Sequence, residues 1–338
     1  MTKLFANFKN NILENKLLSN GERVVASVSG GIDSMVMLDM LVRLSHTMKL
    51  DMTVAHANHG LRGKASDADE ELVKETAACL NILCEVERLT PPKNKNVQDA
   101  ARTLRQGFLK RIAKKHAISA VCLGHHQGDQ AETILLHLIR GSSLAGLRGM
   151  SSISYISELR LVRPMLFASR ADIEEYATKR HIAFREDATN LKTCYRRNEI
   201  RHTLMPLIRE LNPRIETRLS FMAELIAEDD DALEAIAEAF FDETLVSEAK
   251  DQISLNRKLY LTMPAAIRRR ILKLAYTNLT GSSADLNSDQ LTRMDQIALS
   301  SHPRGEYRLP APWQFIREGE FLRMTARQAR PARKASKV

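Results

Sequence analysis

The fold of this chain is decided by the stretch VVASVSGGIDS at Val24–Ser34. An apolar run ends there in a turn with two glycines, and the residues Met35 to Leu44 continue with helical spacing. The pattern predicts a strand, a tight turn and the start of a helix. Adjacent glycines let backbone N–H groups approach an anion closely, and the first turn of a helix favours negative charge. The turn is therefore expected to hold a pyrophosphate.

Three side chains strengthen this expectation. Asp33 can hold Mg²⁺ against the anion, and the hydroxyls of Ser29 and Ser34 can donate to its oxygens. The alternative is an ordinary strand-to-helix turn, in which paired glycines are common. The turn lacks the Lys-Ser/Thr ending of a Walker A loop and the third glycine of a dinucleotide fingerprint. Ser29-Gly30-Gly31-Ile32-Asp33-Ser34 resembles instead the loop of the N-type ATP pyrophosphatases, the PP-loop superfamily, whose members adenylate a second substrate.

Length and composition set the broad class. The chain has 338 residues and is 44% hydrophobic, which suits a globular protein of two domains. No apolar run approaches about 18 residues, so no membrane span is expected. The first residues, Met1–Phe5, lack a secretory apolar core, and a cytoplasmic location is expected. Cys79, Cys84, Cys122 and Cys194 contain no Cys-x-x-Cys pair and are expected to be buried thiols.

Charge is unevenly distributed along the chain, whose formal net charge is +9. Lys192–Arg218 carries seven basic residues against three acids, and Arg323–Lys337 carries six basic residues and no acid. Glu224–Glu248, between them, has ten acids and no Lys or Arg. Segregated basic segments favour a nucleic-acid partner over an ordinary solvated surface. The acidic segment can pair with a basic patch on the same chain or on a second copy, which leaves a homodimer open.

Strand-like runs alternate with helical patterns in the first half of the chain, which predicts a parallel sheet wound by helices. The strand-like runs are Arg23–Ser29, Leu50–His56, Cys84–Leu89 and Ser119–Gly124. The helical patterns are Ser34–Leu44, Asp67–Leu80, Gln98–Lys115 and Ala131–Ile139. The expected fold class is α/β, with a doubly wound, mostly parallel sheet. Ligands gather beyond the carboxyl ends of the strands of such sheets, where the following loops meet.

The rest of the chain predicts a loop, a strand, several helices and a final hairpin. Arg140–Ser157 is rich in Gly and Ser and is expected to form a loop over the site. The later elements are expected at Leu159–Met165, Ser169–His181, Glu224–Phe241, Leu259–Tyr276, Ser288–Leu299 and Arg308–Thr325. We expect a catalytic domain at residues 1–215. Residues 216–338 are expected to form a helical linker and a small α+β domain with a basic tail.

Two other strand ends carry polar clusters. The second strand ends in the run His56–Arg62, with two imidazoles, an amide and a guanidinium that can contact an adenylate or a substrate phosphate. The fourth ends in Gly124–Thr133, where Asp129 and Glu132 share a helical face and can bind Mg²⁺ or a substrate ammonium. The alternative there is a zinc site that adds His125 and His126 to the two acids. Adjacent histidines at a strand end point to opposite sides, which makes joint ligation harder.

Arginines occur in pairs one helical turn apart. Arg102 and Arg105 lie on the third predicted helix and form either a solvated edge or a phosphate grip. The same two alternatives, a solvated surface or an anion contact, apply to Arg196, Arg197 and Arg201. The candidate anions there are a tRNA backbone and a transition-state phosphate.

Together these segments resemble the bacterial tRNA isoleucine lysidine synthase family, from about Arg23 to Asn212. The motifs that carry the resemblance are Ser29–Ser34, His56–Arg62, Ala101–Arg105, Gly124–Thr133, Arg140-Gly141-Ser142, Gly146-Leu147, Arg163-Pro164 and Asp187–Arg201. It implies attachment of L-lysine to carbon 2 of the wobble cytidine in the CAU anticodon of tRNA(Ile). ATP adenylates the cytidine first, and AMP and pyrophosphate are released. Beyond residue 216 the likeness is weaker, and a further C-terminal domain of longer members is not evident.

The resemblance also implies roles for individual residues. The nucleotide would be bound by Ser29, Gly30, Gly31, Ile32, Asp33, Ser34 and His56, with Mg²⁺ held by Asp33 and Asp129. The residues implied to be catalytic are Asp33, Arg102, Arg105, Asp129, Glu132 and Arg201. Two alternatives remain open, a PP-loop tRNA thiolase and a non-catalytic RNA-binding protein switched by ATP.

Overall fold

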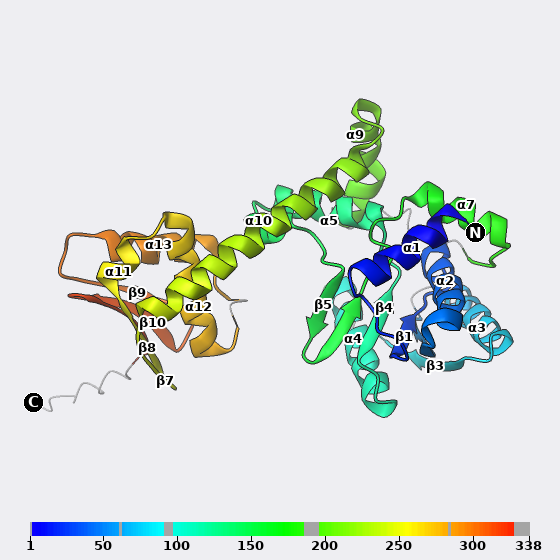
Figure 1. Cartoon of the computed structure of the whole chain (residues 1–338), viewed down its shortest axis with the longest axis horizontal. Helices are drawn as coiled ribbons and strands as arrows, with labels where there is room; N and C mark the ends of the chain where they lie inside the picture. The colour runs from blue at the N-terminus through cyan, green and yellow to red at the C-terminus, as the bar shows by residue number, and fades with distance from the viewer. Residues whose placement is uncertain (1, 61–62, 91–96, 186–195, 283–284, 328–338) are drawn as a thin grey trace, which may run out of the picture. The chain divides into compact units, whose positions relative to one another are not determined.

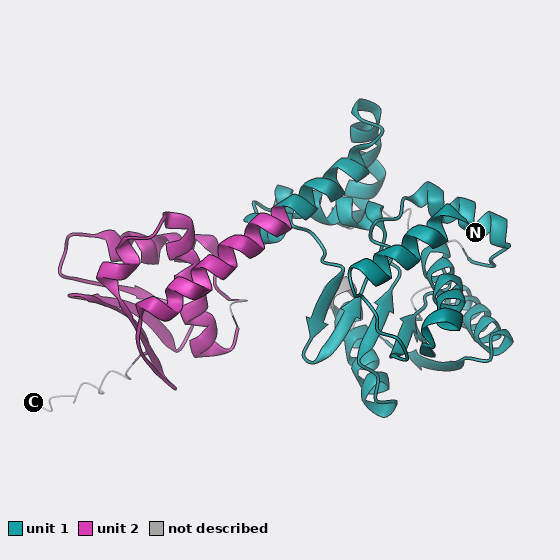
Figure 2. Cartoon of the chain, viewed as in Figure 1, with its two compact units in different colours: residues 1–225 teal, residues 226–338 magenta. Residues whose placement is uncertain are grey.

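The computed structural model describes residues 2–60, 63–90, 97–185, 196–282 and 285–327. The chain forms two compact units, Met1–Leu225 and Ile226–Val338 (Figure 2). The division falls inside helix α10, Ile215–Thr244, and the expected domain boundary lies at the start of that helix. Several sequence features lie outside the described residues, namely Leu61 and Arg62, the connection 91–95, Asp187–Asn190, Cys194 and the tail from residue 328.

The first unit contains a six-stranded sheet with the order β3-β2-β1-β4-β6-β5 (Figure 1). The strands are β1 Arg23–Ser27, β2 Asp51–Asn58, β3 Leu83–Arg88, β4 Ala120–Leu123, β5 Ile153–Ile156 and β6 Leu159–Val162. All neighbouring pairs are parallel except β5 and β6. The predicted α/β class with a mostly parallel sheet is confirmed.

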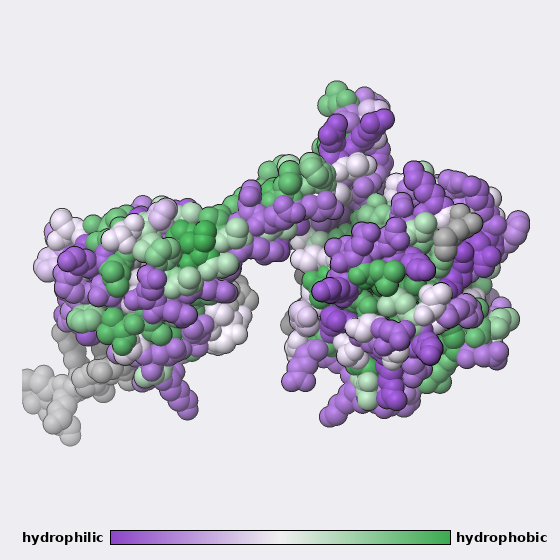
Figure 3. Space-filling view, viewed as in Figure 1, coloured by the Kyte–Doolittle hydropathy of each residue, from purple (hydrophilic) through white to green (hydrophobic). Residues whose placement is uncertain are grey.

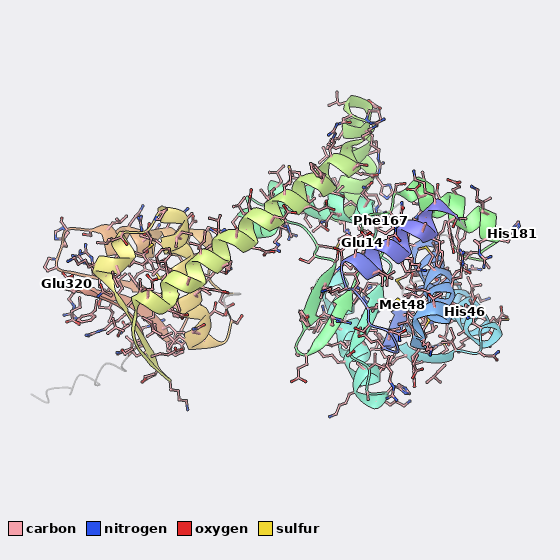
Figure 4. All side chains as sticks on the ribbon, in the orientation of Figure 1. Glu14, His46, Met48, Phe167, His181 and Glu320 are labelled. Carbon is pink, nitrogen blue, oxygen red and sulfur yellow. The ribbon has the colours of Figure 1, made fainter. Side chains whose placement is uncertain are left out.

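Helices cover both faces of this sheet because side chains alternate along its strands. Val24 and Ala26 of β1 join one apolar core with helices α1, α2, α3 and α7, whereas Val25 joins a second core with α4. Phe167, on the segment before α7, packs against the first core (Figure 4). The helices of the unit are α1 Lys3–Glu14, α2 Ile32–Met48, α3 Lys64–Cys79, α4 Val97–Lys115, α5 Gln127–Ile139, α6 Leu144–Leu147, α7 Arg170–Arg180, α8 Arg196–Glu199, the π-helix η2 Ile200–Leu204 and α9 Met205–Leu211.

The stretch 140–157, expected to be a loop, contains helix α6 and strand β5 instead. The side-chain amide of Gln130 accepts from the N–H of Met150 at 2.7 Å and donates to its carbonyl at 3.1 Å. Gly149 has a φ of +65°, and a Cβ there would lie within 2.8 Å of that same amide. The sequence pattern missed this anchoring because it depends on a side chain of the preceding helix.

The second unit pairs a five-stranded antiparallel sheet, in the order β7-β8-β11-β10-β9, with helices. Its elements after α10 are β7 Leu245–Ala249, β8 Gln252–Asn256, α11 Arg257–Leu261, α12 Ala265–Thr280, α13 Ser288–Leu299, β9 Arg304–Arg308, β10 Trp313–Glu318 and β11 Phe321–Ala326. Tyr260, Ile271 and Phe315 are fully buried between the sheet and the helices. The turn at Glu318-Gly319, inside the expected hairpin Arg308–Thr325, joins β10 to β11, with Gly319 at a φ of +58°.

Hydrophilic side chains cover most of the visible surface (Figure 3). Exposed apolar side chains occur on α10, where Phe221, Met222 and Leu225 are 55%, 38% and 46% exposed. No helix among the described residues is long and apolar enough to cross a membrane.

Candidate active site

The site lies where the sheet reverses its strand order, between β1 and β4. Open α/β sheets bind ligands beyond the carboxyl ends of the strands at such a point. A Cβ on Gly124, just after β4, would lie 3.1 Å from the Cα of Ser34 and 3.2 Å from the carbonyl carbon of Asp33. Because Gly124 has no Cβ, the end of β4 packs directly on the first turn of α2 without displacing its backbone. The glycine turn and the start of α5 are thus brought side by side.

The glycine turn is held by its own polar groups. Gly30 has a φ of +90°, and a Cβ there would lie 3.3 Å from the Cβ of the buried Asp69. The Ser34 hydroxyl donates to the Gly31 carbonyl at 2.9 Å and accepts from the N–H of Ser29 at 3.1 Å. Ser34, expected to donate to the anion, is therefore engaged inside the turn, while Ser29 is exposed.

Helix α2 begins at the turn with the buried Ile32, and Gly31 is its N-cap without a side-chain cap. The next residue, Asp33, places a carboxylate in the first turn of the helix. Helix N-termini of this kind bind anions through free N–H groups and the helix dipole. The turn therefore has the local geometry expected of a phosphate site.

Asp33 and Asp129 both face the ring of His126. The Nδ1 atom of His126 accepts from the N–H of Gly128 at 3.0 Å, so a ring proton resides on Nε2. That Nε2 lies 3.6 Å from Oδ2 of Asp129 and 3.9 Å from Oδ1 of Asp33. Burial raises the pKa of Asp33, although His126 and Arg170 oppose the shift. Burial would also raise the pKa of Asp129, but His126, His125 and Arg197 outweigh it and lower that pKa.

Two arginines from the segment after residue 195 hold the acids of α5. Arg197 Nε donates to Glu132 at 2.9 Å, and its Nη2 lies 3.2 Å from Oδ1 of Asp129. Arg201 donates through Nε and Nη2 to both carboxylate oxygens of Glu132, and its Nη2 also lies 3.3 Å from Asp129. The Glu132 side chain is only 6% exposed. Four charged side chains thus form one cluster, which we call the Arg–acid cluster (Asp129, Glu132, Arg197 and Arg201).

A pocket of about 850 Å³ opens beside the Arg–acid cluster, and Arg197 belongs to both. None of the described residues that line it is acidic. Its basic residues are Arg102, Arg105, Arg140, Arg163, Arg196, Arg197, His125 and His137. Its apolar residues are Leu109, Leu123, Leu136, Met150, Ile156 and Leu161. We call it the arginine pocket; its mixed lining suits a ligand with both an anionic and a flat apolar part.

The charges in the arginine pocket disfavour one another. Burial lowers the pKa of Arg105, and Arg102 and Arg197 lower it further. Burial, with a contribution from Arg102, lowers the pKa of Arg163 to about 10. An anion bound among these guanidinium groups would relieve this repulsion. The sequence left Arg102 and Arg105 undecided between a solvated edge and a phosphate grip; both line the pocket, with Arg102 exposed and Arg105 half-buried.

Histidines at the strand ends lie inward. Burial lowers the pKa of His125 to about 4, and its buried Nδ1 has no hydrogen-bond partner among the described residues. His56 is 3% exposed, and its Nδ1 donates to the carbonyl of Val28 at 2.8 Å, beneath the glycine turn. Burial lowers the pKa of His56 as well. A neutral His56 therefore supports the strand that leads into the turn.

Two alternatives from the sequence, a zinc site and a thiolase, depend on metal ligands or reactive cysteines. Among the described residues, no group of three or more His, Cys, Asp or Glu side chains is arranged to hold a metal ion. Cys122 is fully buried, and burial raises its pKa to about 12. Burial raises the pKa of the half-buried Cys84 too. Thiolates are the reactive and metal-binding form of cysteine, and the sites of Cys122 and Cys84 oppose it. Cys79, expected to be a buried thiol, is exposed instead.

The structure brings most of the expected site residues to one edge of the sheet. The glycine turn, Asp33 and Asp129 meet around His126, while Glu132 and Arg201 pair with each other. Arg170 was not singled out from the sequence, and Arg163 and Arg197 were named there only within motifs, without an assigned site role. Arg197 lies four residues before Arg201, and this spacing was the signal available for it.

Comparison with known proteins agrees with this geometry. Residues 2–208 match the model of the PP-loop domain. The tRNA(Ile)-lysidine synthase of Geobacter sulfurreducens is 36% identical over 88% of this chain and 64% of that protein. The enzyme of the same name from Geobacillus kaustophilus is 34% identical over 90% of this chain and 67% of that protein. The chain thus spans about two thirds of the length of these relatives.

A solved structure shares the fold. The U34-tRNA thiolase NcsA from Methanococcus maripaludis superposes with a TM-score of 0.57 at 16% identity, over 67% of this chain and 79% of that one. Fold and glycine turn define a PP-loop protein. Within that class, the chain belongs to the tRNA(Ile)-lysidine synthase family.

Proposed function

We propose that this chain ligates L-lysine to carbon 2 of the wobble cytidine in the CAU anticodon of tRNA(Ile). The observation that carries the proposal is the meeting of a phosphate-sized glycine turn and an arginine-lined pocket at one sheet edge. The names of the matched relatives support the same reaction. A cytoplasmic location is part of this proposal, because it rests on the proposed tRNA substrate.

The reaction runs in two steps. The C2 carbonyl oxygen of the cytidine bonds to the α-phosphorus of ATP, and pyrophosphate leaves with the electrons of the broken P–O bond. The ε-amine of lysine then bonds to C2 and loses a proton, while the C2–O bond breaks and AMP leaves with that oxygen. Adenylation is needed because an oxo group leaves poorly and a phosphate ester leaves readily. The protein must therefore bind a triphosphate, a base and an amine together.

The glycine turn fits the pyrophosphate half of ATP. Gly30 and Gly31 place backbone at the N-terminus of α2, where no side-chain cap competes with an anion. Asp33 and Asp129 fit Mg²⁺, because this ion usually takes one or two carboxylates and completes its shell with phosphate oxygens and water. When bound, Mg²⁺ would offset the charge that develops on the departing pyrophosphate.

The arginine pocket fits the cytidine and its neighbouring phosphates. Its leucines and Ile156 offer apolar surface to a base, and its guanidinium groups offer donors to phosphate oxygens. Extruding a base from the anticodon stack is the usual requirement of enzymes that modify bases. His125 also lines the pocket, and burial keeps its imidazole neutral there.

One assay tests the whole proposal. The protein is incubated with ATP, Mg²⁺, labelled lysine and total tRNA, and the labelled nucleoside is identified. We expect label in a modified cytidine of tRNA(Ile) and one AMP released per lysine incorporated. A thiolase would leave lysine unused, and an ATP-switched RNA-binding protein would release no pyrophosphate in response to RNA. Either result would refute the proposal.

A substitution in the arginine pocket tests where the tRNA binds. We expect Arg105→Gln to weaken tRNA binding about tenfold, because one phosphate contact is lost. The slope of the logarithm of the binding constant against the logarithm of the salt concentration should become shallower by about one. Filter binding across a salt series measures both. Arg111→Gln is the matched control, since Arg111 lies on the same helix but pairs with Glu87 outside the pocket. Equal affinities for the two variants would remove Arg105 from the tRNA site.

A further inference from the structure

Arg170, the first residue of helix α7, points its guanidinium at the glycine turn. Its Nη1 donates to both carboxylate oxygens of Asp33, at 3.1 and 3.3 Å. Its Nε donates to Glu174, one helical turn further along α7, at 2.7 Å. The Nε edge of the guanidinium therefore contacts its own helix. Its Nη1 contacts the Asp33 carboxylate beside the phosphate site.

The position of Arg170 is fixed by a polar clamp between α7 and α2. The Tyr176 hydroxyl donates to Asp39 of α2 at 2.6 Å and accepts from Arg43 of the same helix at 2.7 Å. Arg180 pairs with Asp39 at 3.2 Å. These contacts hold the two helices together along their length, so their N-terminal ends stay adjacent.

The pair between Arg170 and Asp33 is able to open. The two side chains are 44% and 30% exposed, and ion pairs so close to solvent are weak. A divalent cation on Asp33 would compete with Arg170 for the carboxylate. The Nε bond to Glu174 can persist meanwhile, which would leave the Nη edge beside the glycine turn and free to face another anion.

We propose that Arg170 binds the pyrophosphate half of ATP, exchanging the Asp33 carboxylate for phosphate oxygens when Mg²⁺ occupies that carboxylate. Arginine suits this exchange because its planar fork donates equally well to carboxylates and to phosphates. The inference rests on the proposed function only in assigning the triphosphate to the glycine turn. It requires neither tRNA nor lysine.

Calorimetric titration of the full chain with inorganic pyrophosphate and Mg²⁺ tests this inference, with AMP as a second ligand. We expect Arg170→Ala to weaken pyrophosphate binding by about tenfold to a hundredfold, the usual range for lost charge-assisted hydrogen bonds. Arg170→Lys, which keeps the charge but loses the fork, should weaken it less. AMP binding should stay within about twofold, because AMP lacks the β and γ phosphates. Lys179→Ala is the control, since Lys179 pairs with Glu175 on the exposed face of the same helix.

Three results would overturn the inference. The first is pyrophosphate binding by Arg170→Ala within twofold of the parent chain. The second is an equal loss for AMP and pyrophosphate, which would indicate a purely structural ion pair. The third is a parent chain that binds no pyrophosphate. If Arg170→Ala fails to fold, the pyrophosphate and AMP affinities of Arg170→Lys are compared with those of the parent chain in the same way. A parent chain that binds pyrophosphate but never joins lysine to tRNA would refute the proposed function and leave this inference standing.

Discussion

Replacing Asp33 with asparagine is expected to reduce lysine ligation by about a hundredfold to a thousandfold, the range seen when one electrostatic contact to a developing charge is removed. The amide keeps the shape of the side chain but loses the negative charge that would hold Mg²⁺ beside the pyrophosphate. Incorporation of labelled lysine into tRNA(Ile) measures the effect. Activity within threefold of the parent would remove Asp33 from the metal site.

The same substitution is expected to leave the fold intact. Because burial raises the pKa of Asp33, its ionised form is less favourable in the folded chain than in the unfolded chain. Above that pKa, therefore, a neutral amide at this position should not lower the melting temperature. Asp39→Asn is the matched control on the same helix. It breaks the clamp with Tyr176 and Arg180, so it should lower the melting temperature, which Asp33→Asn should not.

The sequence predicted the architecture around the glycine turn for a physical reason. A buried strand followed by paired glycines and a helix is compatible with few structures other than a strand, a tight turn and a helix N-terminus. Parallel strands bring the loops that follow them to one edge of the sheet. That logic predicts from the sequence alone that Asp33 and Asp129 lie near each other. It did not give the direct packing of Gly124 on Ser34, because a glycine in a sequence does not state what approaches it.

The partners of charged side chains were harder to predict. Arg201 was expected to face a phosphate, yet it pairs with Glu132 and Asp129. This pairing depends on how α8 and the π-helix η2 pack against α5, and no local pattern encodes that packing. Arg170 was missed for a similar reason, since its partner Asp33 lies 137 positions away in the chain.

Glu132→Gln is also expected to have a large effect, because it should lower both the free energy of unfolding and the turnover of lysine ligation. Glu132 is nearly buried and accepts from two arginines, so a neutral amide would leave Arg197 and Arg201 with Asp129 as their remaining acid in the Arg–acid cluster. Removing one partner of a buried ion pair costs about 3–5 kcal/mol. We expect a loss near the lower end, because both arginines are about one-third exposed. Urea unfolding of the variant measures the loss.

A double-mutant cycle measures the interaction energy between Glu132 and Arg201 of the Arg–acid cluster. Combining Glu132→Gln with Arg201→Gln should cost less than the sum of the single changes, by about 0.5–3 kcal/mol, because the two groups act on each other. The matched control is Glu216→Gln, whose partner Arg209 is 48% exposed. That control should cost no more than about 1 kcal/mol. Strict additivity would mean that the Glu132–Arg201 pair contributes nothing to folding.

Turnover of Glu132→Gln decides between one role that the sequence allowed for this acid, binding a substrate ammonium, and one that the structure adds, orienting Arg197. In one role, Glu132 binds the ammonium of lysine, and its loss should raise the KM for lysine. In the other, it orients Arg197 at the wall of the arginine pocket, and its loss should lower kcat with little change in that KM. Because both Glu132 oxygens already accept from guanidinium groups, we expect the second pattern. A rise in the lysine KM at unchanged kcat would instead assign Glu132 to the amine.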